Sequence, residues 1–448
     1  MIRIELHANA EPGLVLLPSR LVGDRSGKRF AGILSYGQRQ VSAVFGQSAR
    51  DGRPVPLELG ADLLEALGLH RGVRLFATWD KETSRLRLGP VVSVYVWRTS
   101  SPGSSRFLGP VTDLTRTFIR LARRRGAVAY AFSARDVDWE HGTVSGFVPS
   151  GRTWRRRTFP LPDVVYDRLQ SRRLERSRRY RTCRERLQAQ PGLHYFNPSF
   201  LDKWDVHQAL QNDERARRYL PRTEKLTSIG QVGRWLRAYP TVYIKPTRGS
   251  LGLGVTKVTR TAHGYRYQRV KEKGRSIGLV GSLPKLEKRL QAVLPNRRVI
   301  IQQGLHLARY GGRPYDIRVM VQKTPRGRWA CTNMIARVAS SAGSAVSNVA
   351  TGGDMVGARK AIRGSLGING RRATRRVGRA ARLIAKALEE QLGMEFGEFG
   401  VDMALDRRGR LWLIEVNAKP GRENDDLPGI PPSIRRVVRY AISRAGFR

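Results

Sequence analysis

The chain has 448 residues, a hydrophobic content of 40%, and 83 Lys or Arg against 36 Asp or Glu, so its formal net charge is +47. This length allows two to four domains with cores of their own, and the composition is that of a globular protein. Two distant cysteines exclude a disulfide framework, and the lack of an apolar signal core or of any run of about 18 apolar residues leads us to expect a cytoplasmic protein with no membrane partner.

Residues 1–88 are predicted to form a small β-rich domain. Apolar runs alternate there with Gly, Pro and Ser clusters, which is typical of short strands and turns. The predicted strands include 14–17, 31–34, 41–45 and 72–78, and 59–67 fits one short helix. We expect a domain boundary near Gly89-Pro90.

Residues 89–196 show the pattern of an α/β domain. A strand at 91–96, a helix at 112–125 and a strand at 127–132 make a βαβ unit. The segment 161–168 is predicted as the last strand and its loop. That placement puts Asp167 and Arg168 near a substrate cleft, and a structural ion pair is the alternative interpretation.

A glycine-rich loop follows a short apolar strand in the next part of the chain. The strand at 242–244 is predicted to end at Lys245-Pro246, and glycines follow at 249, 252 and 254. Such glycines let backbone N–H groups approach phosphate oxygens, and Lys245 adds a positive charge. The loop fits neither GxxxxGK[ST] nor GxGxxG, so an ordinary turn is the alternative.

Near the C-terminal end, 399–405 and 411–417 are predicted as two strands of a hairpin with a four-residue turn. If Leu405 pairs with Arg410, Asp402 lies opposite position 413. Because strand side chains alternate, positions 413, 415 and 417 then share one face with Asp402.

This register brings Asp402, Glu415 and Asn417 together on a strand that is otherwise apolar. Two carboxylates and an amide oxygen are hard ligands that suit Mg²⁺ bound with a triphosphate. The alternative is that Glu415 pairs with an arginine and Asn417 caps a turn.

The positive charge is concentrated in two tracts. Residues 152–186 hold thirteen arginines against four acids, and 359–382 hold nine basic residues and no acid. Such density attracts polyanions, including nucleic acid and anionic polymers. A solvated basic face is the alternative, since no RNP-type or zinc-finger motif accompanies the tracts.

The order of these motifs resembles the ATP-grasp superfamily. Lys-Pro before a glycine loop is followed by Gln302-Gln-Gly-Leu305, Asp316-Ile-Arg318, Asp402 and Glu415-Val-Asn417. The stretches 196–207 and 219–223 are similar, more narrowly, to the endospore coat-associated YheC/YheD-like family. The resemblance covers roughly residues 88–440.

The resemblance implies roles for the matching residues. The nucleotide ATP would be held by Lys203, Lys245, Gly249, Ser250, Gly252, Gly254, Gln302, Gln303, Gly304 and Leu305. The stretch 300–304 would be the hinge strand whose backbone meets adenine. The catalytic residues would be Arg318 and Asn348, and the ligands of two Mg²⁺ ions would be Asp402, Glu415 and Asn417. A solvated surface lysine at 203 and a simple turn at 348 are the alternatives.

The expected architecture is α/β and α+β multidomain: a β-rich domain at 1–88, an α/β domain at 89–196, and an ATP-grasp fold with a smaller lobe at 197–300 and a larger lobe at 301–448. The implied function is an ATP- and Mg²⁺-dependent ligase that joins a carboxylate to an amine, associated with the developing spore or its coat. The alternatives are an ATP-grasp kinase and a non-catalytic basic protein of the spore coat that binds a polyanion.

Overall fold

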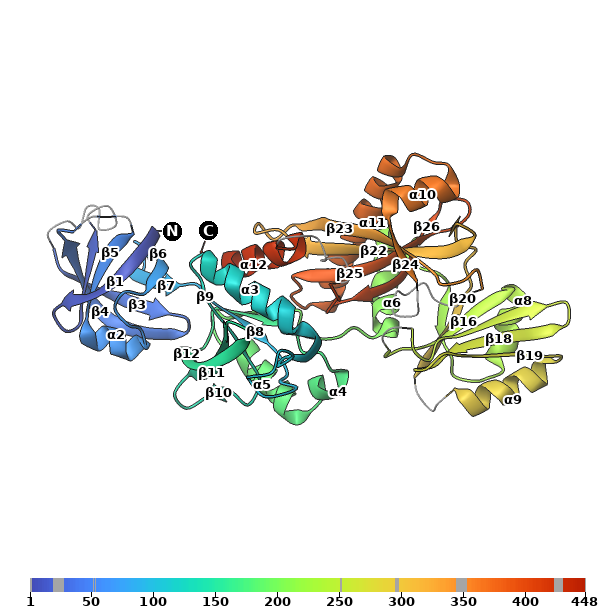
Figure 1. Ribbon diagram of the computed structural model, residues 1–448, viewed down its shortest axis with the longest axis horizontal. Coiled ribbons are helices and arrows are strands. Elements are labelled where there is room, and N and C mark those ends of the chain that lie inside the picture. The colour runs from blue at the N-terminus through green and yellow to red at the C-terminus, as the bar shows by residue number, and fades with distance from the viewer. Residues whose placement is uncertain are drawn as a thin grey trace. The chain divides into compact units, whose positions relative to one another are not determined.

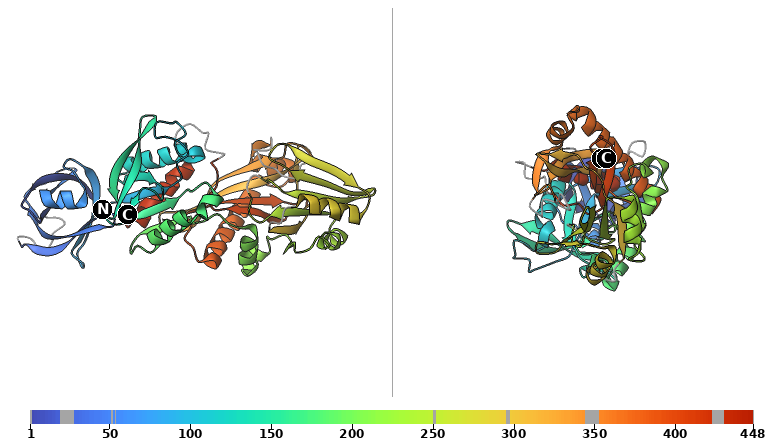
Figure 2. Two further views of the ribbon diagram at one scale, coloured as in Figure 1. Left: turned by 90° about the horizontal axis from the view of Figure 1, so that it is seen from below. Right: turned by 90° about the vertical axis from the view of Figure 1, so that its right-hand side faces the viewer.

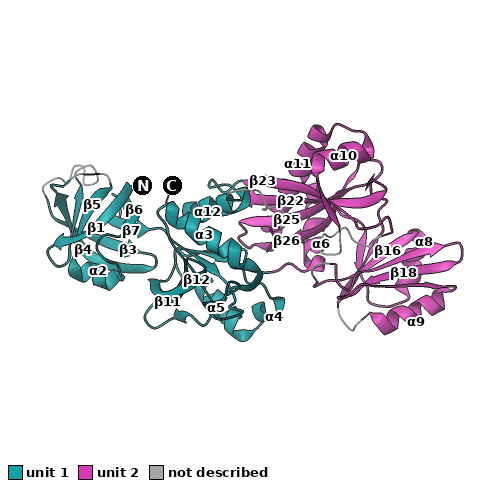
Figure 3. Cartoon of the chain, viewed as in Figure 1, with its two compact units in different colours: residues 1–199, 323–328, 426–448 teal, residues 200–322, 329–425 magenta. Residues whose placement is uncertain are grey.

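The computed structural model describes residues 2–18, 28–50, 52, 54–249, 252–294, 298–343, 353–422 and 430–447. The chain divides into two compact units, coloured separately in Figure 3. Unit 1 comprises residues 1–199, 323–328 and 426–448, and unit 2 comprises residues 200–322 and 329–425. Among the described residues, no helix is long and apolar enough to cross a membrane.

The N-terminal part of unit 1 is a closed barrel with the strand order β1-β5-β2-β4-β3-β7-β6, seen at the blue end of the chain in Figure 2. Its strands are β1 (Ile2–Ala10), β2 (Leu14–Pro18), β3 (Phe30–Tyr36), β4 (Arg39–Ser48), β5 (Val55–Gly60), β6 (Arg74–Asp80) and β7 (Arg85–Gly89). Helix α2 (Ala61–Leu67) lies between β5 and β6, so the predicted strands and the single predicted helix are confirmed. Barrel closure was not predicted, because it uses parallel pairs such as β1 with β5 that are distant in sequence.

The rest of unit 1 is an α/β sheet with the order β10-β11-β9-β8-β13-β14, to which β12 adds by pairing with β11. Its strands are β8 (Val91–Tyr95), β9 (Val128–Phe132), β10 (Val137–Asp138), β11 (Thr143–Ser150), β12 (Thr153–Pro160), β13 (Val164–Asp167) and β14 (His194–Phe196). Its helices are η2 (Gly109–Val111), α3 (Thr112–Arg124), α4 (Arg172–Glu175), α5 (Arg178–Gln188) and α12 (Pro432–Arg444). The predicted βαβ unit is confirmed as β8-α3-β9, with the two strands parallel.

The prediction that 161–168 contains the last strand of this sheet is wrong. Strand β14 pairs in parallel with β13 beyond it, through Val165 and Tyr195. Only three residues long, β14 is too short for a sequence pattern to reveal. Asp167 is buried and accepts a hydrogen bond from Tyr195 Oη at 2.8 Å.

The first lobe of unit 2, called the small lobe, is a sheet with the order β15-β20-β16-β17-β18-β19 (Figure 1). Its elements are β15 (Thr223–Lys225), α8 (Gln231–Ala238), β16 (Thr241–Pro246), β17 (Thr256–Thr261), β18 (Gly264–Val270), β19 (Arg275–Val280), α9 (Leu283–Val293) and β20 (Val299–Gln303). Helices α8 and α9 cover the sheet with buried Leu236 and Leu286. The predicted strand ending at Lys245-Pro246 is confirmed as β16.

The second lobe of unit 2, called the large lobe, is a sheet with the order β24-β23-β22-β25-β26, with β21 pairing with β22. Its strands are β21 (Arg309–Tyr310), β22 (Arg313–Lys323), β23 (Trp329–Val338), β24 (Asp354–Gly357), β25 (Glu398–Leu405) and β26 (Leu411–Asn417). Its helices are α6 (Lys203–Gln211), α7 (Glu214–Arg217), α10 (Ala358–Leu366) and α11 (Gly370–Leu392). Helix α11 begins where the Asn369 side chain accepts a hydrogen bond from Arg372 N, and its buried alanines let it lie close to the sheet.

The expected α/β and α+β multidomain class is confirmed by this architecture. Three helices group differently from the expected division of the chain. Helices α6 and α7 share the core of the large lobe, through Leu210 and Ala216, although they precede the small lobe in sequence. Helix α12 packs with α3 in unit 1, through buried Val438 and Ile119. The four expected domain ranges stay a prediction.

Candidate functional site

The candidate site is a narrow cavity between the two lobes of unit 2, with a volume of about 40 Å³. The residues that line it are Leu201, Asp202, Lys203, Val206, His207, Leu220, Pro221, Thr223, Lys245, Ile300, Gln302, Leu413, Ile414, Glu415 and Val416. Four of them were predicted from sequence, and they come from four different elements. Ligand pockets usually exceed about 300 Å³, so a nucleotide can enter only if side chains in the cavity move apart.

Lys245 lies at the end of β16 and reaches along the sheet to β20. Its Nζ donates a hydrogen bond to Gln302 Oε1 at 2.6 Å, and Gln302 Nε2 donates in turn to Thr223 Oγ1 at 2.9 Å. Burial lowers the pKa of Lys245 to about 8, the charge of Glu415 opposes this shift, and the charge of Lys203 adds to it. The ammonium group is thus available at neutral pH and easily lost above it.

Lys203 is the first residue of α6, which begins where the Asp202 side chain accepts a hydrogen bond from Trp204 N at 2.9 Å. Lys203 Nζ forms an ion pair with Glu415 Oε1 at 2.9 Å and also donates to Gly249 O at 3.2 Å. One ammonium group therefore joins the glycine loop of the small lobe to β26 of the large lobe. This finding speaks against the interpretation of Lys203 as a solvated surface lysine.

The register of the β25–β26 hairpin differs from the prediction. Leu405 pairs with Leu411, not with Arg410, and Asp402 lies opposite Glu415, not opposite position 413. The pairing shifts between Asp402 and Met403, which leaves Ile414 as an extra residue in a β-bulge. Turn length alone cannot reveal a bulge, and the predicted register contained none.

The predicted trio nevertheless shares one face, for a different reason from the one argued. Asp402 lies opposite Glu415, and Gly400 lies opposite Asn417. Positions 400 and 402 are two residues apart on β25, so they face the same side of the sheet, and their partners 417 and 415 face that side as well. Leu413 pairs with Met403 and faces the other side, so its inclusion in the shared face was wrong.

Asp402 belongs to a buried network of two arginines and two aspartates on the large lobe. Arg318 Nε donates to Asp402 Oδ1, and Arg318 Nη2 lies 3.3 Å from Asp402 Oδ2. Arg337 Nη2 contacts Asp402 Oδ2 at 2.9 Å, and Arg337 donates to both carboxylate oxygens of Asp316 at 2.7 and 2.8 Å. Burial alone would raise the pKa of Asp402, but Arg318 and Arg337 hold it below its ordinary value.

Three strands carry a continuous row of charge across the sheet. Arg318 on β22 lies opposite Asp402 on β25, which lies opposite Glu415 on β26. Lys203 closes the row through its ion pair with Glu415. The row has two adjacent carboxylates between two cationic side chains, and such a set can orient a bound polyphosphate and its cation.

The predicted hinge strand and glycine loop have defined backbone contacts. Gln303 N donates to Arg222 O at 3.0 Å, and Gly304 N donates to Thr241 O at 2.8 Å, so these two N–H groups already have partners within the lobe. Gly252 and Gly254 adopt φ of +75° and +77°, values that glycine adopts without strain. Leu305 O accepts from Leu307 N at 3.0 Å. The predicted Ser250 and Asn348 lie outside the described residues.

Several residues of the site were missed by sequence reasoning. Arg337 was one of many arginines, although its place between buried Ala336 and Val338 at the end of an apolar strand was a usable signal. The apolar lining of the cavity carries no pattern that distinguishes it from core. His207 also lines the cavity, and burial lowers its pKa.

The fit of the predicted metal ligands can be tested on their surroundings. Within the described part of the chain, no group of three or more His, Cys, Asp and Glu side chains could hold a metal ion. The predicted set has two carboxylates and one amide on one face, which is a hard oxygen set of the kind Mg²⁺ prefers. Asp402 and Glu415 contact cationic side chains, yet a carboxylate has about four acceptor positions and can also contact a metal ion. The residues therefore fit Mg²⁺.

Two curated relatives of the chain are endospore coat-associated proteins. The chain is 29% identical over 344 residues to endospore coat-associated protein YheD of Bacillus subtilis (strain 168), covering 75% of this chain and 74% of that protein. It is 24% identical over 288 residues to endospore coat-associated protein YheC of the same organism, covering 63% and 77%. Among solved structures, the VanG D-Ala:D-Ser ligase from Enterococcus faecalis aligns with a TM-score of 0.47 at 12% identity, covering 80% of this chain and 99% of that one.

The family comparison covers more than half of the chain. The sequence profile of the YheC/D-like ATP-grasp family matches residues 192–447, which include both lobes of unit 2 and the row of charge described above. The expected ATP-grasp fold is confirmed by this match. The chain therefore belongs to the YheC/D-like ATP-grasp family.

Proposed function

We propose that the protein is an ATP- and Mg²⁺-dependent ligase that activates a carboxylate as an acyl phosphate and then joins it to an amine. The observation that carries the proposal is the row Arg318–Asp402–Glu415–Lys203, which lies beside the cavity that also contains Lys245. Membership of the ATP-grasp family supports the use of ATP.

In this proposal, a carboxylate oxygen of the substrate forms a bond to the γ-phosphorus of ATP, and the bond from that phosphorus to the β-γ bridging oxygen breaks, releasing ADP. An amine then adds to the acyl carbon, inorganic phosphate leaves, and the amine nitrogen loses a proton. Phosphoryl transfer of this kind depends mainly on positioning and charge neutralisation, which lysine and arginine side chains can supply.

Each charged residue has a proposed task. Lys245 and Lys203 contact the phosphates. To do so, Lys245 breaks its hydrogen bond to Gln302, and Lys203 breaks its ion pair with Glu415. Arg318, fixed by Asp402, stabilises negative charge on the transferred phosphoryl group. Asp402, Glu415 and Asn417 would hold Mg²⁺, which when bound neutralises charge on the phosphate oxygens.

The test is a screen of amino acids, short peptides and anionic polymers as carboxylate substrates, with and without amines, following ADP and phosphate release and identifying products by mass spectrometry. A ligase releases phosphate only when both an acid and an amine are present. A kinase releases ADP with one substrate and leaves a stable phosphorylated product. ATP turnover that is the same in the Glu415→Gln variant would contradict the site assignment.

We also propose an association with the spore coat or the developing spore. The support is that both curated relatives are described as endospore coat-associated proteins. Fractionation of spores from the source organism, with an antibody against the protein, tests this proposal. Absence of the protein from the coat and spore fractions, while it is present in vegetative cytoplasm, would contradict it.

A further inference from the structure

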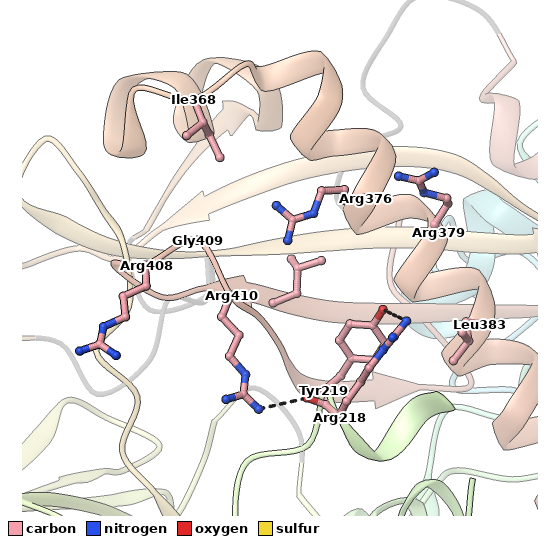
Figure 4. A pocket seen from close by; sticks show the side chains of 10 residues that line it. Arg218, Tyr219, Ile368, Arg376, Arg379, Leu383, Arg408, Gly409 and Arg410 are labelled. Carbon is pink, nitrogen blue, oxygen red and sulfur yellow. Dashed lines mark hydrogen bonds between the residues drawn. The ribbon is translucent and has the colours of Figure 1, made fainter. Parts of the chain in front are cut away.

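A second cavity lies on the large lobe, apart from the candidate nucleotide site, and has a volume of about 810 Å³ (Figure 4). The residues that line it are Arg218, Tyr219, Ile368, Arg376, Arg379, Leu383, Arg408, Gly409, Arg410 and Leu411. Five of these ten are arginines, and the four others with side chains beyond a hydrogen atom are apolar or aromatic. None of these ten residues is acidic.

Among the described residues, the positive charge of this cavity, called the arginine cavity, is not paired with carboxylates. Within the described part of the chain, no carboxylate forms an ion pair with any of the five arginines. The Asp406 carboxylate lies in the adjacent turn and caps it. It accepts hydrogen bonds from Arg408 N and Arg410 N at 2.9 Å and from Trp412 Nε1 at 3.0 Å. Like charges gathered without partners repel each other, so an anion placed among them would lower the energy.

Two of the guanidinium groups are held in place by aromatic rings. The Arg410 guanidinium lies 4.0 Å from the centroid of the Trp412 ring, and Arg410 Nη2 donates to Arg218 O at 3.4 Å. The Arg218 guanidinium lies 5.0 Å from the centroid of the Tyr219 ring, and its Nη2 donates to Tyr219 Oη at 3.0 Å (Figure 4). Side chains that are already oriented lose less conformational entropy when they bind a ligand.

The opposite wall of the arginine cavity is one face of helix α11. Arg376, Arg379 and Leu383 are spaced by three and four residues, so they lie along the same side of the helix (Figure 4). Arg376 and Arg379 are exposed to solvent, while Leu383 is partly buried. The cavity thus has guanidinium groups on two walls and apolar surface between them.

We propose that the arginine cavity binds a small organic anion that carries two or more carboxylate or phosphate groups. A guanidinium group donates two parallel hydrogen bonds to either kind of oxyanion, and two walls of arginine suit a ligand with separated acidic groups. Leu383, Leu411 and Tyr219 would contact its carbon skeleton. The volume falls in the usual range of small-molecule sites, about 300–1,000 Å³. This inference is independent of the proposed ligase function.

The arginine cavity and the nucleotide cavity are separated by a thin wall. Tyr219 and Leu411 line the arginine cavity, whereas Leu220 and Leu413 line the nucleotide cavity. The two segments are joined by a hydrogen bond from Leu413 N to Tyr219 O at 2.7 Å. Because each cavity has its own lining residues, substitutions can remove charge from one without changing the other.

The experiment measures binding of two probes, tricarballylate for carboxylates and inorganic tripolyphosphate for phosphates, by isothermal titration calorimetry on the full chain. The test variant is Arg376→Gln/Arg379→Gln. The matched control is Arg372→Gln/Arg375→Gln, which removes the same charge from exposed positions of the same helix outside the cavity. We expect at least one probe to bind about tenfold more weakly to the test variant, and less than about threefold more weakly to the control.

The two probes distinguish the acidic group of the ligand. The probe that binds more tightly identifies carboxylate or phosphate as the group that the cavity recognises. Equal losses in the test and control variants would assign binding to the general positive field and overturn the proposal. Unchanged affinity in the test variant, or no binding of either probe to the natural chain, would also overturn it. Tripolyphosphate binding that is lost in Lys245→Met but kept in Arg376→Gln/Arg379→Gln would place that probe in the nucleotide cavity, and it would overturn the proposal if tricarballylate binding is also unchanged in Arg376→Gln/Arg379→Gln.

Discussion

Arg318 and Asp402 lie directly opposite each other on β22 and β25, and their side chains form an ion pair that is almost completely buried. Arg337 and Asp316 belong to the same network, so two positive and two negative charges lie together in the interior of the large lobe. Buried charges of this kind cost much desolvation free energy, and they are tolerated only when all partners are present. The network therefore fixes the middle of the large lobe in one geometry, next to Glu415.

The Asp402→Asn substitution should strongly lower the free energy of unfolding. It removes the negative charge that Arg318 and Arg337 share, which should cost about 3–5 kcal/mol. Urea denaturation of the natural and variant chains measures the difference. The exposed ion pair between Asp354 and Arg313 gives a control, since Asp354→Asn should cost only about 0–1 kcal/mol.

A double substitution separates the charge network from simple packing. Arg318→Met combined with Asp402→Leu removes both partners of one pair, and it should destabilise the chain by less than the sum of the two single substitutions. Strict additivity in urea denaturation would show that the two side chains do not interact energetically.

Nucleotide affinity should depend on pH through Lys245, whose pKa is about 8 in the free protein. Below pH 8 the ammonium group is charged and attracts phosphate, and above pH 8 it becomes neutral. The dissociation constant for a non-hydrolysable ATP analogue should therefore rise as pH increases from about 7 to 9.5, by up to about tenfold for each unit above the pKa. Calorimetric titrations at several pH values measure this.

The Lys245→Met variant is the control for that assignment. It should bind the analogue weakly at pH 7 and show a flatter pH profile, because the titrating group is gone. A variant that kept the full pH dependence would assign the titration to another residue.

Glu415→Gln should reduce Mg²⁺-dependent ATP turnover by about two orders of magnitude or more, because it removes a carboxylate that both contacts Lys203 and would hold the metal. The fold should persist, with a melting temperature within about 4 °C of the natural chain, since the side chain is 26% exposed. Glu390→Gln, an exposed glutamate of α11 with basic partners, should leave turnover unchanged. Equal activity in both variants would contradict the metal assignment.

Gly304→Ala should destabilise unit 2 by about 1–3 kcal/mol, because a Cβ atom at Gly304 would lie 2.6 Å from Thr241 O and 2.7 Å from Thr241 Cβ. The contact holds the end of the hinge strand against the start of β16. Gly230→Ala is the matched control, since nothing lies within 4 Å of its Cβ position and it should cost little or nothing. Thermal denaturation of both variants distinguishes the two outcomes.

Local pattern was sufficient to predict much of the candidate site. The strand ending at Lys245-Pro246 and the shared side of Glu415 and Asn417 follow from β-branched residues, glycines and the two-residue period of strands. These features depend on neighbours a few residues apart, and sequence reports such neighbours directly. The place of Asp402 opposite Glu415 depends instead on the bulge at Ile414.

Contacts between distant segments could not be predicted in the same way. Arg337 contacts Asp402 only because the sheet brings together residues 65 positions apart, and its apolar neighbours in sequence do not identify that partner. The hydrogen bond from Lys245 to Gln302 likewise depends on the pairing of β16 with β20. The barrel of residues 2–89 contains three parallel pairs of strands. The alternation of apolar and polar residues along a strand does not predict which strands pair.

Because of the bulge at Ile414, the cavity lining and the pairing of the two carboxylates on the hairpin can vary separately during evolution. Ile414 lines the cavity between the two lobes of unit 2, yet it has no partner on β25, while Glu415 is paired with Asp402. Deleting or exchanging this one residue would reshape the cavity and leave the opposed carboxylates where they are. A lineage could thus change which molecule enters the cavity through single-residue events, without rebuilding the charged centre beside it.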